Sequence, residues 1–189
     1  SYGWGKRDAQ NVPYEVVTGA EYANYDPIFG NAFETVVRCK NHGSITDPGA
    51  YVQALADHFV EQGGTLHITK INDLEMTDGA VTALITEDGL LRADKIVFAM
   101  GPWSRETAHK LGVKVPFESE RGYHIELINP SVMPRSPMMV ASGKFVVTPM
   151  QGRIRAAGVV EFGGLDAAPS REPFDMLRRR LKTLLPDVT

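Results

Sequence analysis

The segment KIVFAMGPWS, Lys95 to Ser104, has the pattern most suggestive of chemistry. Its first half, Lys95–Ala99, is apolar on both faces, as expected of a covered central strand. Gly101 then leads into a helix predicted from Ser104 to Leu111. In α/β proteins, phosphates and cofactors bind where the carboxyl end of a strand meets a helix. We therefore predict a ligand-binding crevice at Gly101, although the sequence has no dinucleotide-binding Gly-x-Gly-x-x-Gly motif.

Arginine occupies alternating positions in two later strand candidates. Arg121 and Tyr123 share one strand face, and so do Arg153 and Arg155. The planar guanidinium group can bind a carboxylate through two parallel hydrogen bonds. The three arginines are therefore candidate cations for an anionic ligand.

The remaining polar residues exclude several other chemistries. The five histidines form no i, i+4 pair, and the single cysteine cannot build a thiolate metal site, so no metal centre is predicted. The sequence has neither a Gly-x-Ser-x-Gly elbow nor a P-loop. A net charge of −3 and a pI near 5.9 argue against nucleic-acid binding.

Length and composition describe an ordinary globular chain. Its 189 residues, 43% of them apolar, suffice for one large domain or two small ones. The lone Cys39 excludes an internal disulfide and fits a reducing, cytoplasmic location; its strand context predicts a buried side chain. No segment reaches membrane-spanning length, no signal peptide is present, and the start at Ser1 is consistent with a piece cut from a longer protein.

The order of predicted elements is that of a β-rich α/β (α+β) protein. Turn and capping signals indicate where these elements begin and end. Asp78-Gly79 and Asp88-Gly89 predict hairpin turns. Thr18 and Glu21 have the spacing of a capping box, and Ser170 is the predicted cap of the last helix. The predicted helices are 18–25, 48–62, 104–111 and one from Ser170 with a leucine stripe. The predicted strands are 33–39, 65–69, 73–77, 80–86, 90–92, 95–99, 121–128, 145–148 and 154–162.

Four segments carry a family resemblance. They are GSITDPGAYVQALADHFVEQGGTLHITKINDLEMTDGAV (Gly43–Val81), ADKIVFAMGPWS (Ala93–Ser104), VPFESERGYHIEL (Val115–Leu127) and KFVVTPMQGRIRAAGVVEFGG (Lys144–Gly164). In this order they resemble the FAD-dependent D-amino acid oxidase/dehydrogenase superfamily, the D-amino acid dehydrogenase branch most of all.

This resemblance implies an architecture and a cofactor. It predicts a substrate domain with a central antiparallel or mixed sheet, built from residues 1–47 and 117–189. Residues 48–116 would form part of the FAD-binding domain, with a helix, a β-meander and a strand-glycine turn. The family's pyrophosphate-binding glycine motif would precede Ser1, and further substrate and flavin segments would follow Thr189. We therefore expect this chain alone not to hold FAD tightly or to turn over.

The resemblance also assigns residues to the two ligands. The cofactor would contact the backbone at Ile71 and the turn formed by Ala99, Met100 and Gly101. Trp103 would either stack near the cofactor or anchor the following helix. An amine or amino-acid substrate would be held by Arg121, Tyr123, Phe145 and Arg155, which we expect to converge on one face of the sheet; no catalytic residue is assigned.

Several alternatives remain open at this stage. Arg121 could instead form an ion pair with Glu118 or Glu120. Phe145 stands where oxidases of the family place a tyrosine, so that hydroxyl contact is absent or moved, for example to Tyr123. The chain could also belong to a non-catalytic binding module of the same fold, or to an enzyme that oxidises a 2-hydroxy acid.

Overall fold

The computed structural model describes residues 2–189 and divides the chain into two compact units. The core unit joins the chain up to Pro48 with Glu120–Thr189, and the meander unit is Gly49–Ser119. Among the described residues, no helix combines the length and apolar character needed to cross a bilayer.

The core unit contains a four-stranded antiparallel sheet in the order β6-β9-β8-β7. Its strands are β6 (Glu120–Ile128), β7 (Met138–Val140), β8 (Phe145–Met150) and β9 (Arg153–Phe162). The three longer strands were expected and are confirmed within two residues. Strand β7 was not expected, because its three residues follow a proline-broken segment and pair only with β8. A β-bulge interrupts the β6–β9 ladder beside Tyr123 and His124.

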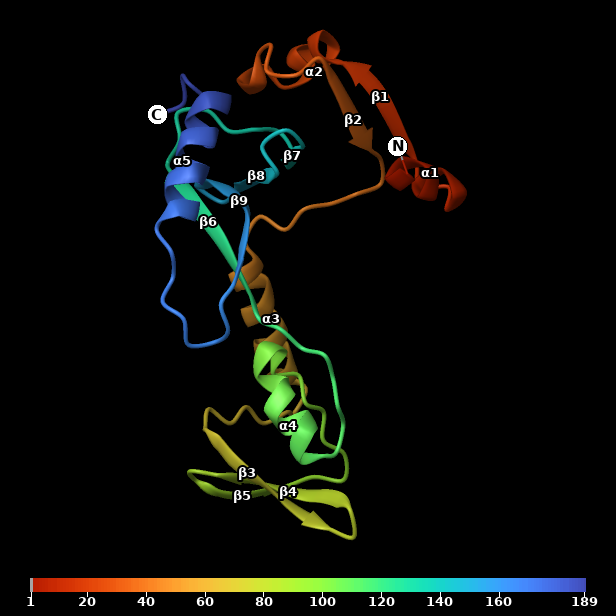
Figure 1. The fold of residues 1–189 in the computed structure, drawn as a ribbon, viewed down its shortest axis with the longest axis vertical. Coiled ribbons are helices and arrows are strands. Elements are labelled where there is room, and N and C mark those ends of the chain that lie inside the picture. Colours follow the sequence, from red (N-terminus) through yellow and green to blue (C-terminus); the bar gives the residue numbers. More distant parts are fainter. Residues whose placement is uncertain (1) are drawn as a thin grey trace. The chain divides into compact units, whose positions relative to one another are not determined.

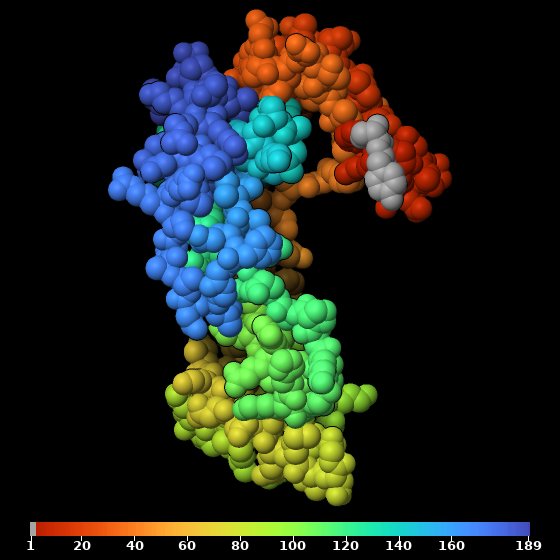
Figure 2. All heavy atoms as spheres, viewed as in Figure 1, coloured from red at the N-terminus to blue at the C-terminus, as the bar shows by residue number. Residues whose placement is uncertain are grey.

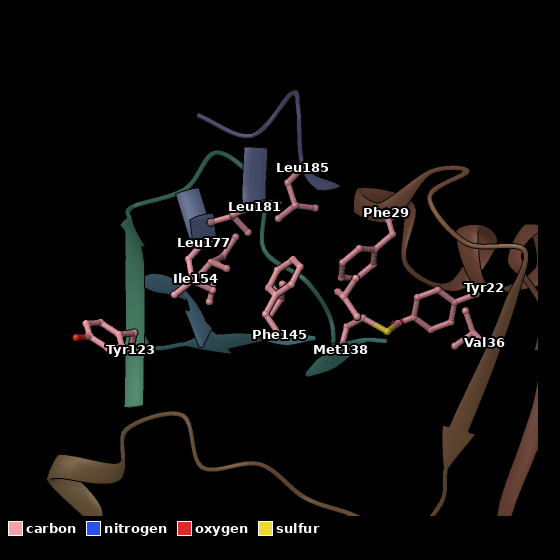
Figure 3. Packing of buried hydrophobic residues seen from close by; sticks show 13 residues of the cluster. Tyr22, Phe29, Val36, Tyr123, Met138, Phe145, Ile154, Leu177, Leu181 and Leu185 are labelled. Atoms are coloured by element: carbon pink, nitrogen blue, oxygen red, sulfur yellow. The ribbon is translucent and has the colours of Figure 1, made fainter. Parts of the chain in front are cut away.

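Helix α5 (Glu172–Leu184) covers one face of this sheet (Figure 1). The expected leucine stripe is confirmed, since Leu177 and Leu181 are buried against Ile154 and Phe145 (Figure 3). The predicted cap at Ser170 is wrong: Arg171 occupies the N-cap position, and the Ser170 hydroxyl donates to Glu161 instead.

The N-terminal part of the core unit contributes a second, smaller layer. It comprises α1 (Tyr2–Ala9), β1 (Tyr14–Thr18), α2 (Gly19–Tyr25), a 3-10 turn η1 (Pro27–Phe29) and β2 (Thr35–Cys39), with β1 and β2 paired antiparallel. The capping box of Thr18 and Glu21 starts α2 as predicted. Tyr22 and Phe29 join the core beside Met138 (Figure 3). The expected burial of Cys39 is wrong, because this residue ends a strand with only one neighbour and is exposed.

The meander unit consists of two helices, a 3-10 turn and a small sheet. These are α3 (Pro48–Glu61), β3 (Ile71–Thr77), β4 (Ala80–Thr86), β5 (Gly89–Arg92), η2 (Gly101–Trp103) and α4 (Ser104–Lys110). The predicted antiparallel meander is confirmed, in the order β3-β4-β5. Asp78 and Gly79 both have positive φ, 51° and 79°, as a two-residue hairpin turn requires. Residues 71–119, yellow to green in Figure 2, form one contiguous group of atoms.

Two expected strands of the meander unit do not form. Residues 65–69 and 95–99 have no strand conformation, and Ile68 and Val97 are 93% and 87% exposed. A strand is stable only when a neighbour accepts and donates its backbone hydrogen bonds. Within residues 2–189 neither segment is paired in a sheet. The apolar composition of these two segments predicted buried strands, but the segments are not paired here and so are not strands.

Candidate functional site

Arg121 and Tyr123 lie on the face of the sheet that packs against α5. Tyr123 is 3% exposed and its ring meets Phe174 of α5 edge-on, with 5.0 Å between the centroids. Arg121 pairs in register with Glu161, and its guanidinium lies 3.6 Å from that carboxylate. The ion pair considered for Arg121 therefore exists, but with Glu161 rather than Glu118 or Glu120.

Glu161 is the centre of a polar cluster that fastens the loop before α5. Its carboxylate accepts hydrogen bonds from the hydroxyls of Ser170 and Tyr123, and the Tyr123 oxygen accepts from the Ser170 amide at 2.8 Å. Arg121 also donates to the carbonyl of Ala167. The bonds from Ser170 and Tyr123, aided by the Arg121 charge, hold the pKa of Glu161 below its ordinary value. Arg121 and Tyr123 thus have internal partners for their polar groups.

Phe145 is a core residue. It is 2% exposed and lies among Ile154, Leu177 and Met138, from the sheet and α5 (Figure 3). Close packing extends to Gly158 at the bulge, where an added Cβ would lie 2.5 Å from the Phe145 Cα. The ring therefore fills the interior on the α5 side.

Arg155 lies on the opposite face of the sheet. Its register partners are Glu126 on β6 and Thr148 on β8, whereas Ile154 and Ala156 on either side of it point into the core. Residues directly opposite in an antiparallel pair share a face. Arg155 therefore shares its face with His124, Glu126 and Arg153, and not with Arg121.

Arg155 differs from Arg121 in its partners. Its Nη2 lies 3.1 Å from Nδ1 of His124, and its buried Nε has no hydrogen-bond partner within the described chain. No ion pair joins Arg155 to a carboxylate in the described part of the chain, and Glu126, its register partner, bonds Nε of Arg153 at 3.2 Å. Arg155 thus keeps an unneutralised charge and an unused donor, which a carboxylate ligand could accept.

The expected convergence of four residues on one face is therefore wrong. Arg121, Tyr123 and Phe145 face α5, and Arg155 faces away from it. Alternation along a strand shows which residues of that strand share a face, but not which face of a neighbouring strand matches it. The register of strand pairing decides which faces match, and register cannot be deduced from alternation within single strands. His124 and Glu126, which were not among the predicted site residues, lie on the face of Arg155. Individual contacts with substrate stay predictions.

At the Gly101 turn, the predicted strand of residues 95–99 is absent, whereas the helix predicted from Ser104 forms as α4. Gly101 has φ of 56°, a conformation that favours glycine, and an added Cβ would meet no atom within 4 Å. Trp103 is 64% exposed, so it does not anchor α4 within the meander unit. Ile71, at the start of β3, is also partly exposed. The turn is open to a ligand, and the cofactor contacts of these residues stay predictions.

Comparison with known proteins agrees with this fold. The sequence profile of the family described as "FAD dependent oxidoreductase" matches residues 2–189. A D-amino-acid oxidase of Bradyrhizobium diazoefficiens is 34% identical over 97% of this chain and 44% of its own length. A D-amino acid dehydrogenase of Rhizobium rhizogenes is 27% identical over 82% of this chain and 39% of its own.

Among solved structures, the L-proline dehydrogenase from P. horikoshii superposes with a TM-score of 0.79 at 17% identity, covering 95% of this chain and 50% of that one. At such low identity the likeness shows the fold alone. The chain spans less than half the length of the curated relatives that it matches. On the strength of the profile match along its described length, this chain belongs to the family of FAD-dependent oxidoreductases.

Proposed function

We propose that this chain is the substrate-binding portion of an enzyme that oxidises an amine or amino acid by hydride transfer to flavin. The observation that carries the proposal is Arg155, an arginine with an unneutralised charge on the sheet face opposite α5. Amino acids bring a carboxylate that needs such a cation. The family match supplies the redox chemistry.

FAD, when bound, accepts the hydride, and the protein has to orient the substrate and exclude water. The residues proposed to hold the cofactor are the backbone of Ile71 and the turn of Ala99, Met100 and Gly101, with Trp103 beside it. The positive φ and open surroundings of Gly101 fit this role, because they permit close approach of a ligand to the backbone.

Arg155 would bind the substrate carboxylate and so fix the position of the carbon that is oxidised. A carboxylate would accept from guanidinium donors other than the Nη2 that contacts His124, and Arg155 lies on strand β9 rather than in a loop. Charge-assisted hydrogen bonds contribute about 1.5–3 kcal/mol each. The loss of this contact should therefore weaken binding of amino acids and leave binding of amines without a carboxylate nearly unchanged.

The test uses the complete protein that contains this chain. Flavin reduction is followed anaerobically with D- and L-amino acids, secondary amines, decarboxylated amines and 2-hydroxy acids. We expect reduction by amino acids or amines. Arg155→Gln should raise KM for the best amino acid about 10- to 100-fold, as the loss of a charge-assisted bond predicts. Arg178→Gln is the matched control, because Arg178 is 72% exposed on α5.

Two outcomes would contradict the proposal. Flavin reduction by hydroxy acids alone would change the substrate class. An equal rise in KM for amino acids and for amines without a carboxylate would show that Arg155 supports the structure rather than the substrate.

A further inference from the structure

We propose that Arg153 and His124 are positioning residues that keep the charge of Arg155 available to an anionic ligand. The inference deepens the proposed function and rests on it. It concerns three charged residues and one imidazole on the sheet face opposite α5: Glu126, Arg153, Arg155 and His124.

Glu126 is the natural competitor for Arg155. The two are directly opposite in the β6–β9 register, and oppositely charged cross-strand pairs normally attract. The Glu126 carboxylate nevertheless bonds diagonally to Nε of Arg153, at 3.2 Å. Arg153 and Glu126 side chains are only 27% and 29% exposed, so solvent screens this pair incompletely. Arg153 thereby engages the carboxylate that lies opposite Arg155 in the register.

His124 contacts Arg155 without cancelling its charge. All guanidinium nitrogens of arginine are donors, so Nδ1 of His124 must accept the 3.1 Å hydrogen bond from Nη2. This hydrogen bond requires the tautomer whose ring proton lies on Nε2. One donor of Arg155 is thus fixed in place, which orients the planar group while leaving Nε without a protein partner among the described residues.

These contacts make a specific prediction about removal of Arg153. Loss of its guanidinium would release Glu126, which already lies opposite Arg155 in the register. The released carboxylate would then compete with a carboxylate ligand for Arg155. Removal of both Arg153 and Glu126 would abolish the competition and restore binding. A purely structural role of Arg153 does not predict such a rescue.

The experiment measures KM and kcat of the complete protein for its best amino-acid substrate and for the matching amine without a carboxylate. Arg153→Gln should raise KM for the amino acid about two- to fivefold, the range for a partly exposed ion pair. Arg153→Gln/Glu126→Gln should return it to the wild-type value, and Arg178→Gln should leave it unchanged. KM for the amine should not respond to any of the three.

Substitution at His124 tests the second contact. His124→Phe removes the acceptor and should raise KM for the amino acid, whereas His124→Asn supplies an amide oxygen and should retain most of the affinity. The inference is overturned if Arg155→Gln raises KM for the amino acid but Arg153→Gln does not. It is also overturned if adding Glu126→Gln to Arg153→Gln fails to return KM to the wild-type value. If Arg155→Gln itself has no effect on KM for the amino acid, the proposed function of Arg155 fails instead.

Discussion

The core unit and the meander unit contain similar elements but bury them very differently. In the core unit, α5 and the N-terminal layer enclose a continuous apolar cluster that includes Ile154 and Leu177, both fully buried. In the meander unit only Ala83 and Thr86 are buried among the described residues, and α3 buries none. Leu55 and Phe59 of α3 are both more than half exposed.

This difference in burial shows that a helix or hairpin can form from local signals even where tertiary packing adds little to its stability. Helix α3 starts at a proline and ends before Gly63-Gly64, and the β3–β4 hairpin forms around Asp78-Gly79, so local signals suffice to define both. Complete burial of a large apolar side chain adds about 1.5–3 kcal/mol. The core unit has this contribution at many positions, and the meander unit has it at almost none.

The largest expected effect comes from deletion of a core side chain. Leu177→Ala leaves a cavity beside Ile154 and should reduce the free energy of unfolding by about 2–5 kcal/mol. Leu55→Ala is the matched control on α3, where the side chain is 53% exposed. It should cost less than about 0.5 kcal/mol. Urea unfolding measures both, and equal costs would break the comparison between the units.

A smaller effect is expected from the turn on which the meander depends. Gly79→Ala forces a side chain into a φ of 79° and should destabilise the hairpin by about 1 kcal/mol. Hydrogen exchange should accelerate in β3 and β4 and stay unchanged in β8 and β9. Gly122→Ala is the control, since this glycine has no positive φ and open space around it. Equal acceleration in both units would show that they unfold together.

The smallest effect concerns the polar cluster at Glu161 in the core unit. Its pKa is lowered mainly by the Ser170 hydrogen bond, so the folded state favours the carboxylate. The resulting stabilisation is fully present above the ordinary glutamate value of 4.5 and is lost as pH falls through the lowered pKa. The stability difference between wild type and Glu161→Gln should therefore be larger at pH 7 than at pH 3. If the difference in urea midpoint between wild type and Glu161→Gln were the same at both pH values, the proposed stabilisation by the Glu161 carboxylate would be wrong.

The family and the types of most elements could be predicted from the sequence. The order of four motifs predicted the FAD-dependent oxidoreductase family, and the profile match confirms it. The capping box at Thr18 formed as expected because its hydrogen bonds span only three residues. The leucine stripe of α5 could also be predicted, because residues on one face of a helix recur at a fixed spacing.

The candidate site was harder to predict, because it depends on how strands meet. Arg155 lies opposite Glu126 only through the register of β6 and β9, and His124 reaches it across that ladder. Alternation correctly placed Arg121 and Tyr123 on one face of their strand. No local pattern indicated whether α5 would pack against the sheet face of Arg121 or against that of Arg155. Glu161 reaches Arg121 across the β6–β9 register, and Ser170 reaches Glu161 from the loop before α5; neither contact is local in sequence.

The sequence by itself thus determined the structures whose stabilising contacts are local: the capping box of Thr18 and Glu21, the hairpin turn at Asp78-Gly79 and the stripe of α5. Tertiary structure decided the strands and the site, because a strand is completed only by a neighbour that is distant in sequence. Residues 95–99 have strand composition but no paired neighbour within residues 2–189, whereas Arg155 has a register partner on each side and a charge that neither partner neutralises.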